Sequence, residues 1–152
     1  MVIETEKDDQ QKFLIFQMGA EFFGTPLIDV RQVIEFHQAK PIPQMPPYFK
    51  GVINIRGEII GVVDLRERLS LKVTEPGLSQ LVFDTDSGPL AATVDRVQSV
   101  TVIEASQIDL RTASAQTADR SYFLGVAKVG DRIVTIMDLR RLFVGTSTPA
   151  TT

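Results

Sequence analysis

The sequence predicts an all-β protein, mostly strands with short helices, built from two similar small barrels. Short runs rich in β-branched residues alternate with glycine-containing turns, which is typical of consecutive hairpins. The second half of the chain also repeats landmarks of the first half at matching spacings. A unit of about 65–70 residues that occurs twice is too long and too few for a solenoid, so two packed barrels fit better.

The central element is a hairpin formed by residues 52–55 and 59–63. Gly57 is expected to take the positive φ that a tight turn needs. Because both runs are apolar, we expect this hairpin to be buried on both faces. Asp64 is expected to cap a short helix after the second strand, and Glu67 to reach back in a capping box.

The remaining elements follow from local patterns on either side of this hairpin. Four prolines between positions 41 and 47 predict an extended loop, because each proline fixes φ and lacks an N–H donor. Residues 105–118 are polar and irregular. The other strands that apolar or alternating runs predict are residues 13–16, 22–30, 33–36 (continuing the preceding strand after a bulge), 80–83, 90–94, 97–102, 122–129 and 132–137.

The duplication is seen most clearly at two glycine–aspartate pairs. Gly51 and Gly125 each follow an aromatic-plus-one pair, and each lies 13 residues before an Asp-Leu-Arg, from 51 to 64 and from 125 to 138. Asp64 and Asp138 therefore open equivalent helices, and all four residues are expected to be structural.

These landmarks predict one domain over residues 12–144, with barrel subdomains at about 12–75 and 76–144. The two subdomains could also exchange strands. Residues 1–11 and 145–152 read as flexible tails. The acidic first tail carries Glu4, Glu6, Asp8 and Asp9 against Lys7, which accounts for the whole net charge of −3.

Composition excludes several classes of function. A formally neutral body without a basic run argues against nucleic acid or an anionic membrane as the main partner. No apolar run approaches the roughly 18 residues of a membrane span, and the polar N-terminus does not resemble a secretory signal. The absence of cysteine removes thiolate metal sites and fits a cytoplasmic setting.

A search for catalytic or metal-binding residues yields none. His37 is the only histidine and reads as an ordinary surface residue. Residues 84–88 resemble the start of a calcium loop but lack its later glycine and glutamate, so a hairpin turn fits better. Asp64 and Asp138 could be paired carboxylates, but helix capping accounts for both. No cofactor is expected.

Three residues leave a partner-binding role open. Arg56 at the hairpin tip could be a solvated turn residue, could brace a loop through its guanidinium, or could meet a partner. Val30 and Val33 are core residues by default, but a strand edge beside a proline-rich loop is also where a barrel can accept a partner.

The stretch Phe49-Lys50-Gly51-Val52-Ile53-Asn54-Ile55-Arg56-Gly57, followed by Val62-Val63-Asp64-Leu65-Arg66, resembles the signature of the CheW family of bacterial chemotaxis coupling proteins. The likeness extends from about residue 13 to residue 143. It implies two intertwined five-stranded barrels related to SH3 barrels. It also implies a non-enzymatic adaptor that bridges the cytoplasmic tip of chemoreceptors to the regulatory domain of the histidine kinase CheA.

The resemblance also implies which residues meet partners. Arg56, Asn54 and Gly57 match the family's Asn-x-Arg-Gly motif, and Val30 matches an apolar position on the partner-facing barrel. Gln32 stands where many members have glutamate, so a contact through that carboxylate would be weakened. Two hypotheses from other classes stay open: a stand-alone barrel that binds a peptide or small ligand, and an enzyme with an unrecognised site.

Overall fold

The computed structural model describes residues 12–110 and 121–146, and strands dominate this part of the chain. The helical elements are single turns, two of them 3₁₀ turns (η). The predicted fold class, mostly β with short helices, is therefore confirmed. In chain order the elements are β1 (Lys12–Met18), β2 (Glu21–Pro26), η1 (Leu27–Asp29), β3 (Gln32–Glu35), β4 (Phe49–Ile55), β5 (Glu58–Asp64), α2 (Leu65–Arg68), β6 (Ser79–Thr85), β7 (Gly88–Val94), β8 (Arg96–Val102), η2 (Ala105–Gln107), β9 (Ile108–Asp109), β10 (Phe123–Val129), β11 (Arg132–Met137) and α4 (Leu139–Leu142).

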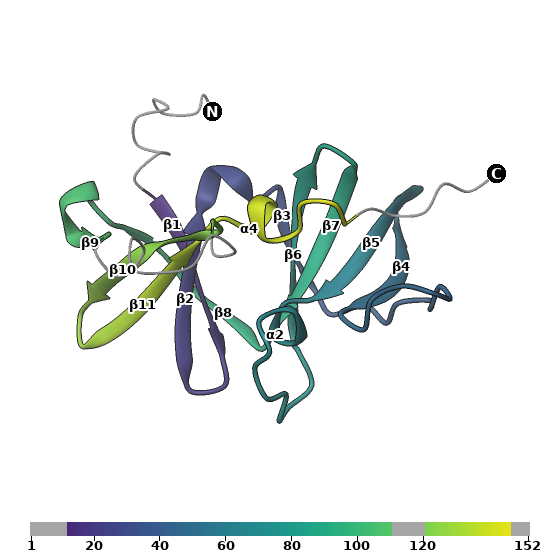
Figure 1. Ribbon diagram of the computed structural model, residues 1–152, viewed down its shortest axis with the longest axis horizontal. Coiled ribbons are helices and arrows are strands. Elements are labelled where there is room, and N and C mark those ends of the chain that lie inside the picture. The colour runs from purple at the N-terminus through teal and green to yellow at the C-terminus, as the bar shows by residue number, and fades with distance from the viewer. Residues whose placement is uncertain (1–11, 111–120, 147–152) are drawn as a thin grey trace.

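The strands form two sheets that lie side by side (Figure 1). The six-stranded sheet has the order β8-β1-β2-β11-β10-β9, and the five-stranded sheet has the order β3-β6-β7-β5-β4. Each sheet joins a hairpin from one half of the chain to a hairpin from the other through a parallel pair, β2 with β11 and β5 with β7. The two halves of the sequence are thus interleaved in space.

Over residues 12–110 and 121–146, neither sheet closes into a complete barrel. The strand order leaves two edge strands in each sheet, β8 and β9 in one, β3 and β4 in the other. The sixth strand of the larger sheet is the two-residue β9, which pairs with β10. β9 lies within residues 105–118, the segment expected to be irregular. Such a short strand has no periodicity that a sequence pattern could reveal.

The expected continuation of β2 into residues 33–36 is wrong. Pro26 ends β2, and one 3₁₀ turn follows, in which the Val30 N–H donates to the Leu27 carbonyl at 3.0 Å. The Arg31 N–H then donates to the Val82 carbonyl at 2.7 Å, so β3 pairs with β6 in the other sheet. The 3₁₀ turn redirects the chain because proline offers no N–H with which to continue the ladder.

The expectation that the central hairpin is buried on both faces is correct for one strand only. β5 lies between β7 and β4 and is buried from Ile60 to Asp64. β4 is an edge strand, and Lys50 and Asn54 on it are exposed. Ile59, at the tip of the hairpin, is 44% exposed despite its apolar side chain.

The core consists of three clusters, one inside each curved sheet and a larger one between the sheets. The cluster between the sheets stacks Phe16 on Phe23 and joins Phe83 to Phe143 with ring centroids 5.9 Å apart in each pair. Burial of these aromatic rings holds the sheets together. The clusters inside the six-stranded and five-stranded sheets contain Phe13, Ile15, Ile103, Ala127, Val134 and Ile136, and Ala39, Ile53, Ile60, Val62, Val82 and Ala91, respectively.

The described part of the chain ends at Thr146, inside the segment expected to be a C-terminal tail. Thr146 is buried, and its Oγ1 lies 2.9 Å from the hydroxyl of Tyr48. The acidic N-terminal tail, residues 111–118 of the segment expected to be irregular, and residues 147–152 lie outside the described residues.

Candidate functional site

The tip of the β4–β5 hairpin is a two-residue turn made by Arg56 and Gly57. Both residues have positive φ, 52° for Arg56 and 87° for Gly57. The side-chain oxygen of Asn54 accepts from the Gly57 N–H at 2.9 Å and fixes the turn from the strand side. Glycine adopts positive φ freely, whereas arginine, which has a Cβ, pays a conformational free-energy cost there.

Arg56 is exposed and, within the described residues, takes part in no hydrogen bond or ion pair. Of the three interpretations that the sequence left open, bracing of a loop by Arg56 therefore fails. The equivalent turn of the β10–β11 hairpin carries Gly130 at φ 62° in the corresponding position. Arg56 thus places a cation, without a partner in the described part of the chain, where the other hairpin has glycine, which adopts positive φ most easily.

The arginine that braces this end of the five-stranded sheet is Arg31, which the sequence reasoning missed. Its guanidinium donates to both carboxylate oxygens of Glu58, at 2.7 and 3.2 Å, and to Asp84 at 2.6 Å. The hydrogen bonds with Glu58 and then Asp84 raise the pKa of Arg31 above its ordinary value. Its partners lie 27 and 53 residues away, so no local pattern points to the contact.

The other predicted partner-facing residues lie on or beside edge strand β3. Val30 is half-buried and packs against the cluster between the sheets, as the default core interpretation expects. Gln32 is exposed, and Val33 is 44% exposed. Because the bonds from Arg31 to Glu58 join the start of β3 to the start of β5, the structure brings β3 and the Arg56 turn to one end of the sheet.

Gly51 and Gly125 occupy equivalent bulges, one in β4 and one in β10. Both have positive φ, 137° and 144°. A side chain at Gly51 would overlap the carbonyl of Lys40, which pairs with Val52, and a Cβ at Gly125 would lie 2.8 Å from the carbonyl oxygen of Asp109. Each glycine allows a neighbouring segment to cover the edge of its hairpin.

Asp64 and Asp138 occupy the N-cap positions of α2 and α4. Asp64 accepts from the backbone N–H groups of Arg66 and Glu67, and Asp138 does the same in α4. The predicted capping box at Glu67 is wrong, because Glu67 pairs with Lys50 instead, at 2.5 Å, and the Asp64 N–H donates to Tyr48. Strand pairing already satisfies the N–H that a capping box would serve.

A buried ionic cluster centred on Arg66 was also missed. Arg66 holds both oxygens of Asp64, at 3.0 and 2.9 Å, and also binds Asp95 at 2.9 Å and the Glu75 carbonyl at 2.7 Å. Asp95 in turn accepts from the Gly19 N–H at 2.6 Å. The hydrogen bond with Asp64 raises the pKa of Arg66 above its ordinary value, burial opposes that rise, and the bond with Asp95 adds to it.

The described residues contain no group of three or more side chains that could hold a metal ion. His37 is exposed, and its Nδ1 lies 2.7 Å from the carbonyl oxygen of Glu35. Residues 84–88 form the β6–β7 turn, closed by the Thr85 hydroxyl, which donates to the Gly88 carbonyl at 2.7 Å. No helix in the described part is long and apolar enough to span a membrane.

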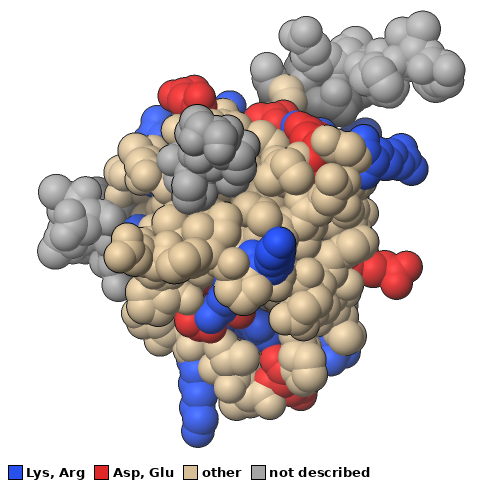
Figure 2. All heavy atoms as spheres, turned by 90° about the vertical axis from the view of Figure 1, so that its right-hand side faces the viewer, with Lys and Arg blue, Asp and Glu red and all other residues tan. Residues whose placement is uncertain are grey.

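Charge on the outer end of the five-stranded sheet is scattered. Figure 2 shows single Lys, Arg, Asp and Glu side chains of both signs around broad uncharged areas. A surface of this kind suits protein contacts better than phosphate backbones. With open sheet edges, fixed turns and an arginine that is unpaired among the described residues, the fold and this surface define a class of protein: a β scaffold that binds other proteins.

Comparison with known proteins identifies the family. The CheW-like domain matches residues 12–146, and the chain therefore belongs to the CheW-like family. Members of this family are adaptors without enzymatic activity. The expectation of a non-enzymatic protein is confirmed on this basis.

Individual relatives agree over most of the chain. The chemotaxis protein CheW of Klebsiella aerogenes is 30% identical over 138 residues, covering 87% of this chain and 81% of that protein. CheW of Rhizobium meliloti is 27% identical over 135 residues, covering 88% and 87%. The crystal structure of the scaffolding protein TtCheW from Thermoanaerobacter tengcongensis is similar with a TM-score of 0.79 at 27% identity, covering 88% of this chain and 92% of that one.

Proposed function

We propose that this chain is the adaptor that couples chemoreceptors to the histidine kinase CheA in a bacterial chemosensory array. In this proposal it contacts the cytoplasmic tip of the receptor and the regulatory domain of the kinase, and it acts in the cytoplasm at the inner face of the membrane through the receptor array. Family membership supports the role of coupling, and the edge strands support contacts with more than one protein.

The observation that carries the assignment of the surface is Arg56. A non-glycine residue in the left-handed region costs about 1 kcal/mol or more. Arg56 is at φ 52° and has no partner among the described residues to offset that cost. A free guanidinium held in this way is suited to directed hydrogen bonds with a carboxylate on another protein.

Asn54 and Gly57 fix the turn that presents Arg56, while Gln32 and Val33 supply the neighbouring edge of β3. Val30, just before β3, packs against the cluster between the sheets. Such an adaptor changes the activity of the kinase only if it contacts the active and inactive arrangements of the array unequally. Binding through a modest interface on each side is sufficient for that purpose.

Reconstitution tests the proposal directly. The chain is mixed with a cytoplasmic fragment of a chemoreceptor and with CheA, and co-elution and kinase activity are measured. A ternary complex in which receptor state controls kinase activity is expected. Arg56→Ala should lose most of the receptor or kinase affinity while keeping the wild-type melting temperature, and Lys128→Ala, an exposed cation two residues before the equivalent turn, should behave as wild type.

Failure of the wild-type chain to bind either protein would refute the coupling role. Ligand-dependent melting shifts with small metabolites, and none with the two proteins, would favour a stand-alone binding module. The comparisons support the adaptor and give no support to that module.

A further inference from the structure

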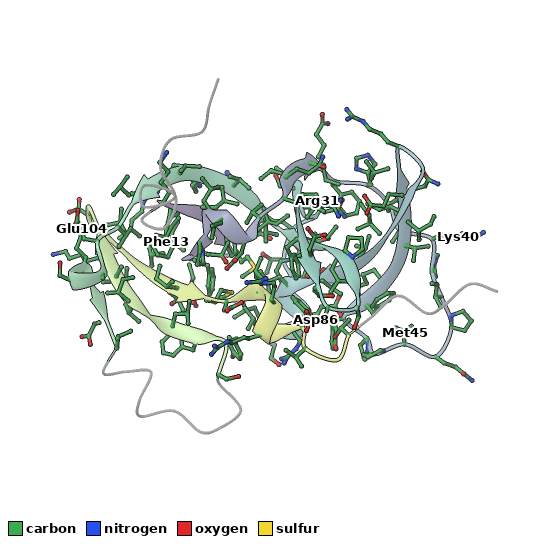
Figure 3. The ribbon with its side chains drawn as sticks, turned by 90° about the horizontal axis from the view of Figure 1, so that it is seen from above. Phe13, Arg31, Lys40, Met45, Asp86 and Glu104 are labelled. Atoms are coloured by element: carbon green, nitrogen blue, oxygen red, sulfur yellow. The ribbon has the colours of Figure 1, made fainter. Side chains whose placement is uncertain are left out.

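Arg31 links the tips of two hairpins of the five-stranded sheet. Glu58 begins β5 immediately after the Arg56–Gly57 turn, and Asp84 lies near the end of β6, beside the β6–β7 turn. Figure 1 shows both turns at the upper side of this sheet, as the parallel pairing of β5 with β7 requires. Figure 3 shows Arg31 where the chain passes from η1 into β3. One guanidinium therefore engages two carboxylates from different hairpins.

Glu58 lies next to the turn that carries Arg56, so the ion pairs of Arg31 affect the surroundings of Arg56. Glu58 pairs directly across the hairpin from Ile55, the residue that precedes Arg56. Its carboxylate therefore flanks the turn that presents Arg56. Opposite charges on neighbouring turn residues attract each other unless one of the charged groups is already paired with a third group. Arg31 occupies both oxygens of Glu58 and one oxygen of Asp84.

We propose that Arg31 keeps Arg56 available for a partner by pairing with the two neighbouring carboxylates, Glu58 and Asp84. The group on the partner that Arg56 recognises is then acidic. This inference rests on the proposed function. It makes Arg31 a residue that determines specificity without touching the partner itself.

A simple bracing role for Arg31 makes a different prediction. The three side chains are 34%, 46% and 62% exposed, and ion pairs in such positions contribute little to stability. A brace would act through the position of the hairpin tips and would be lost together with its partners. If Arg31 instead keeps Glu58 and Asp84 from pairing with Arg56, it is needed only while both carboxylates are charged. Removing their charges should then restore partner binding in the absence of Arg31.

The test compares Arg31→Ala with the triple variant Arg31→Ala, Glu58→Gln and Asp84→Asn. Affinity for the receptor fragment and for CheA is measured by calorimetry at one fixed salt concentration. Arg31→Ala is expected to weaken binding about two- to fivefold, because Arg56 then forms an exposed ion pair within the molecule. The triple variant is expected to regain wild-type affinity, and Lys128→Ala serves as the control cation. Unchanged binding in Arg31→Ala, or no recovery in the triple variant, would overturn the inference.

A second readout needs no partner. Hydrogen exchange of the Arg56 side-chain Nε–H is followed by NMR in the free protein. Exchange should be fast in the wild-type chain, slow in Arg31→Ala and fast again in the triple variant. Equal exchange rates in the wild-type chain, Arg31→Ala and the triple variant would refute the role of Arg31, even if the chain is shown to couple receptor to kinase. Absence of binding by the wild-type chain would instead count against the proposed function, and exchange of the Arg56 proton would still decide the role of Arg31.

Discussion

Arg66 and Arg140 are equivalent residues of the two Asp-Leu-Arg segments, and each forms an ion pair with an aspartate from the other half of the chain. Arg66 reaches Asp95 at 2.9 Å, and Arg140 reaches Asp29 at 3.2 Å. The two contacts differ in burial: the side chain of Arg66 is 7% exposed and that of Arg140 is 56% exposed. Equivalent arginines thus join the two halves of the chain through one buried and one exposed ion pair.

Arg66→Leu should strongly destabilise the fold. Its removal leaves Asp64 and Asp95 buried without their cation, which costs roughly 3–5 kcal/mol when a buried pair is broken. Urea unfolding measured by circular dichroism gives the loss of free energy. The matched control is Arg140→Leu, whose exposed ion pair should be worth no more than about 1 kcal/mol. Equal losses in the two variants would contradict the ranking.

Gly51→Ala should destabilise the chain far more than Gly57→Ala, although both glycines have positive φ. A side chain at Gly51 meets the backbone of Lys40, whereas a Cβ at Gly57 has nothing within 4 Å. Gly57→Ala should therefore cost only the conformational penalty of about 1 kcal/mol. Gly51→Ala adds a clash with backbone that cannot rotate away. Melting temperatures of the two variants decide the point, and a larger loss at Gly57 would be inconsistent with it.

Local patterns were sufficient to predict the hairpins and their turns. Gly57 marks a tight turn because it lies between two adjacent apolar runs, and Asp64 caps a helix because its side chain lies next to the first free N–H groups. The matching glycines at 51 and 125 revealed the duplication. These features depend on residues that are close in sequence.

Contacts between distant residues could not be predicted in this way. The pairing of β2 with β11 and the crossing of β3 to β6 depend on how two similar halves interleave, which alternation along one strand does not encode. The contacts of Arg31 with Asp84 and of Arg66 with Asp95 carry no local signal, because the partners lie 53 and 29 residues apart in sequence.

Asp29→Asn should stabilise the protein more at pH 7 than at pH 3. Burial raises the pKa of Asp29 above its ordinary 3.8; Arg140 acts to lower it and Asp138 to raise it. The folded chain therefore holds the Asp29 proton to a higher pH than the unfolded chain does. Stability contributed by this group falls as pH rises between the two pKa values. An amide at position 29 removes that fall.

The measurement is the difference in free energy of unfolding between variant and wild type at the two pH values. Asp131→Asn, in the exposed β10–β11 turn, is the control and should show little difference at either pH. A stabilisation by Asp29→Asn that is larger at pH 3 would mean that the ion pair with Arg140 outweighs burial.

Gln32→Glu should strengthen binding to receptor or kinase if this exposed position on β3 is a contact. The resemblance to the family implies a glutamate at this position in many members, and the side chain of Gln32 is exposed, next in sequence to Arg31. A new carboxylate would add a charge-assisted hydrogen bond to a cationic group on the partner, typically about 1.5–3 kcal/mol. Titration calorimetry with each partner measures the gain. Gln32→Asn is the neutral control, and identical affinities for all three chains would remove position 32 from the interface.

Arg56→Gly should move stability and partner affinity in opposite directions. Glycine relieves the positive φ of 52°, so the free energy of unfolding should rise by up to about 1 kcal/mol. The same change removes the unpaired guanidinium, so binding to the receptor fragment or to CheA should weaken by roughly tenfold or more. Thermal melting and calorimetry on one preparation test both effects. A variant that is less stable than wild type would indicate that Arg56 supports the fold, and one that binds equally well would show that the turn geometry alone is recognised.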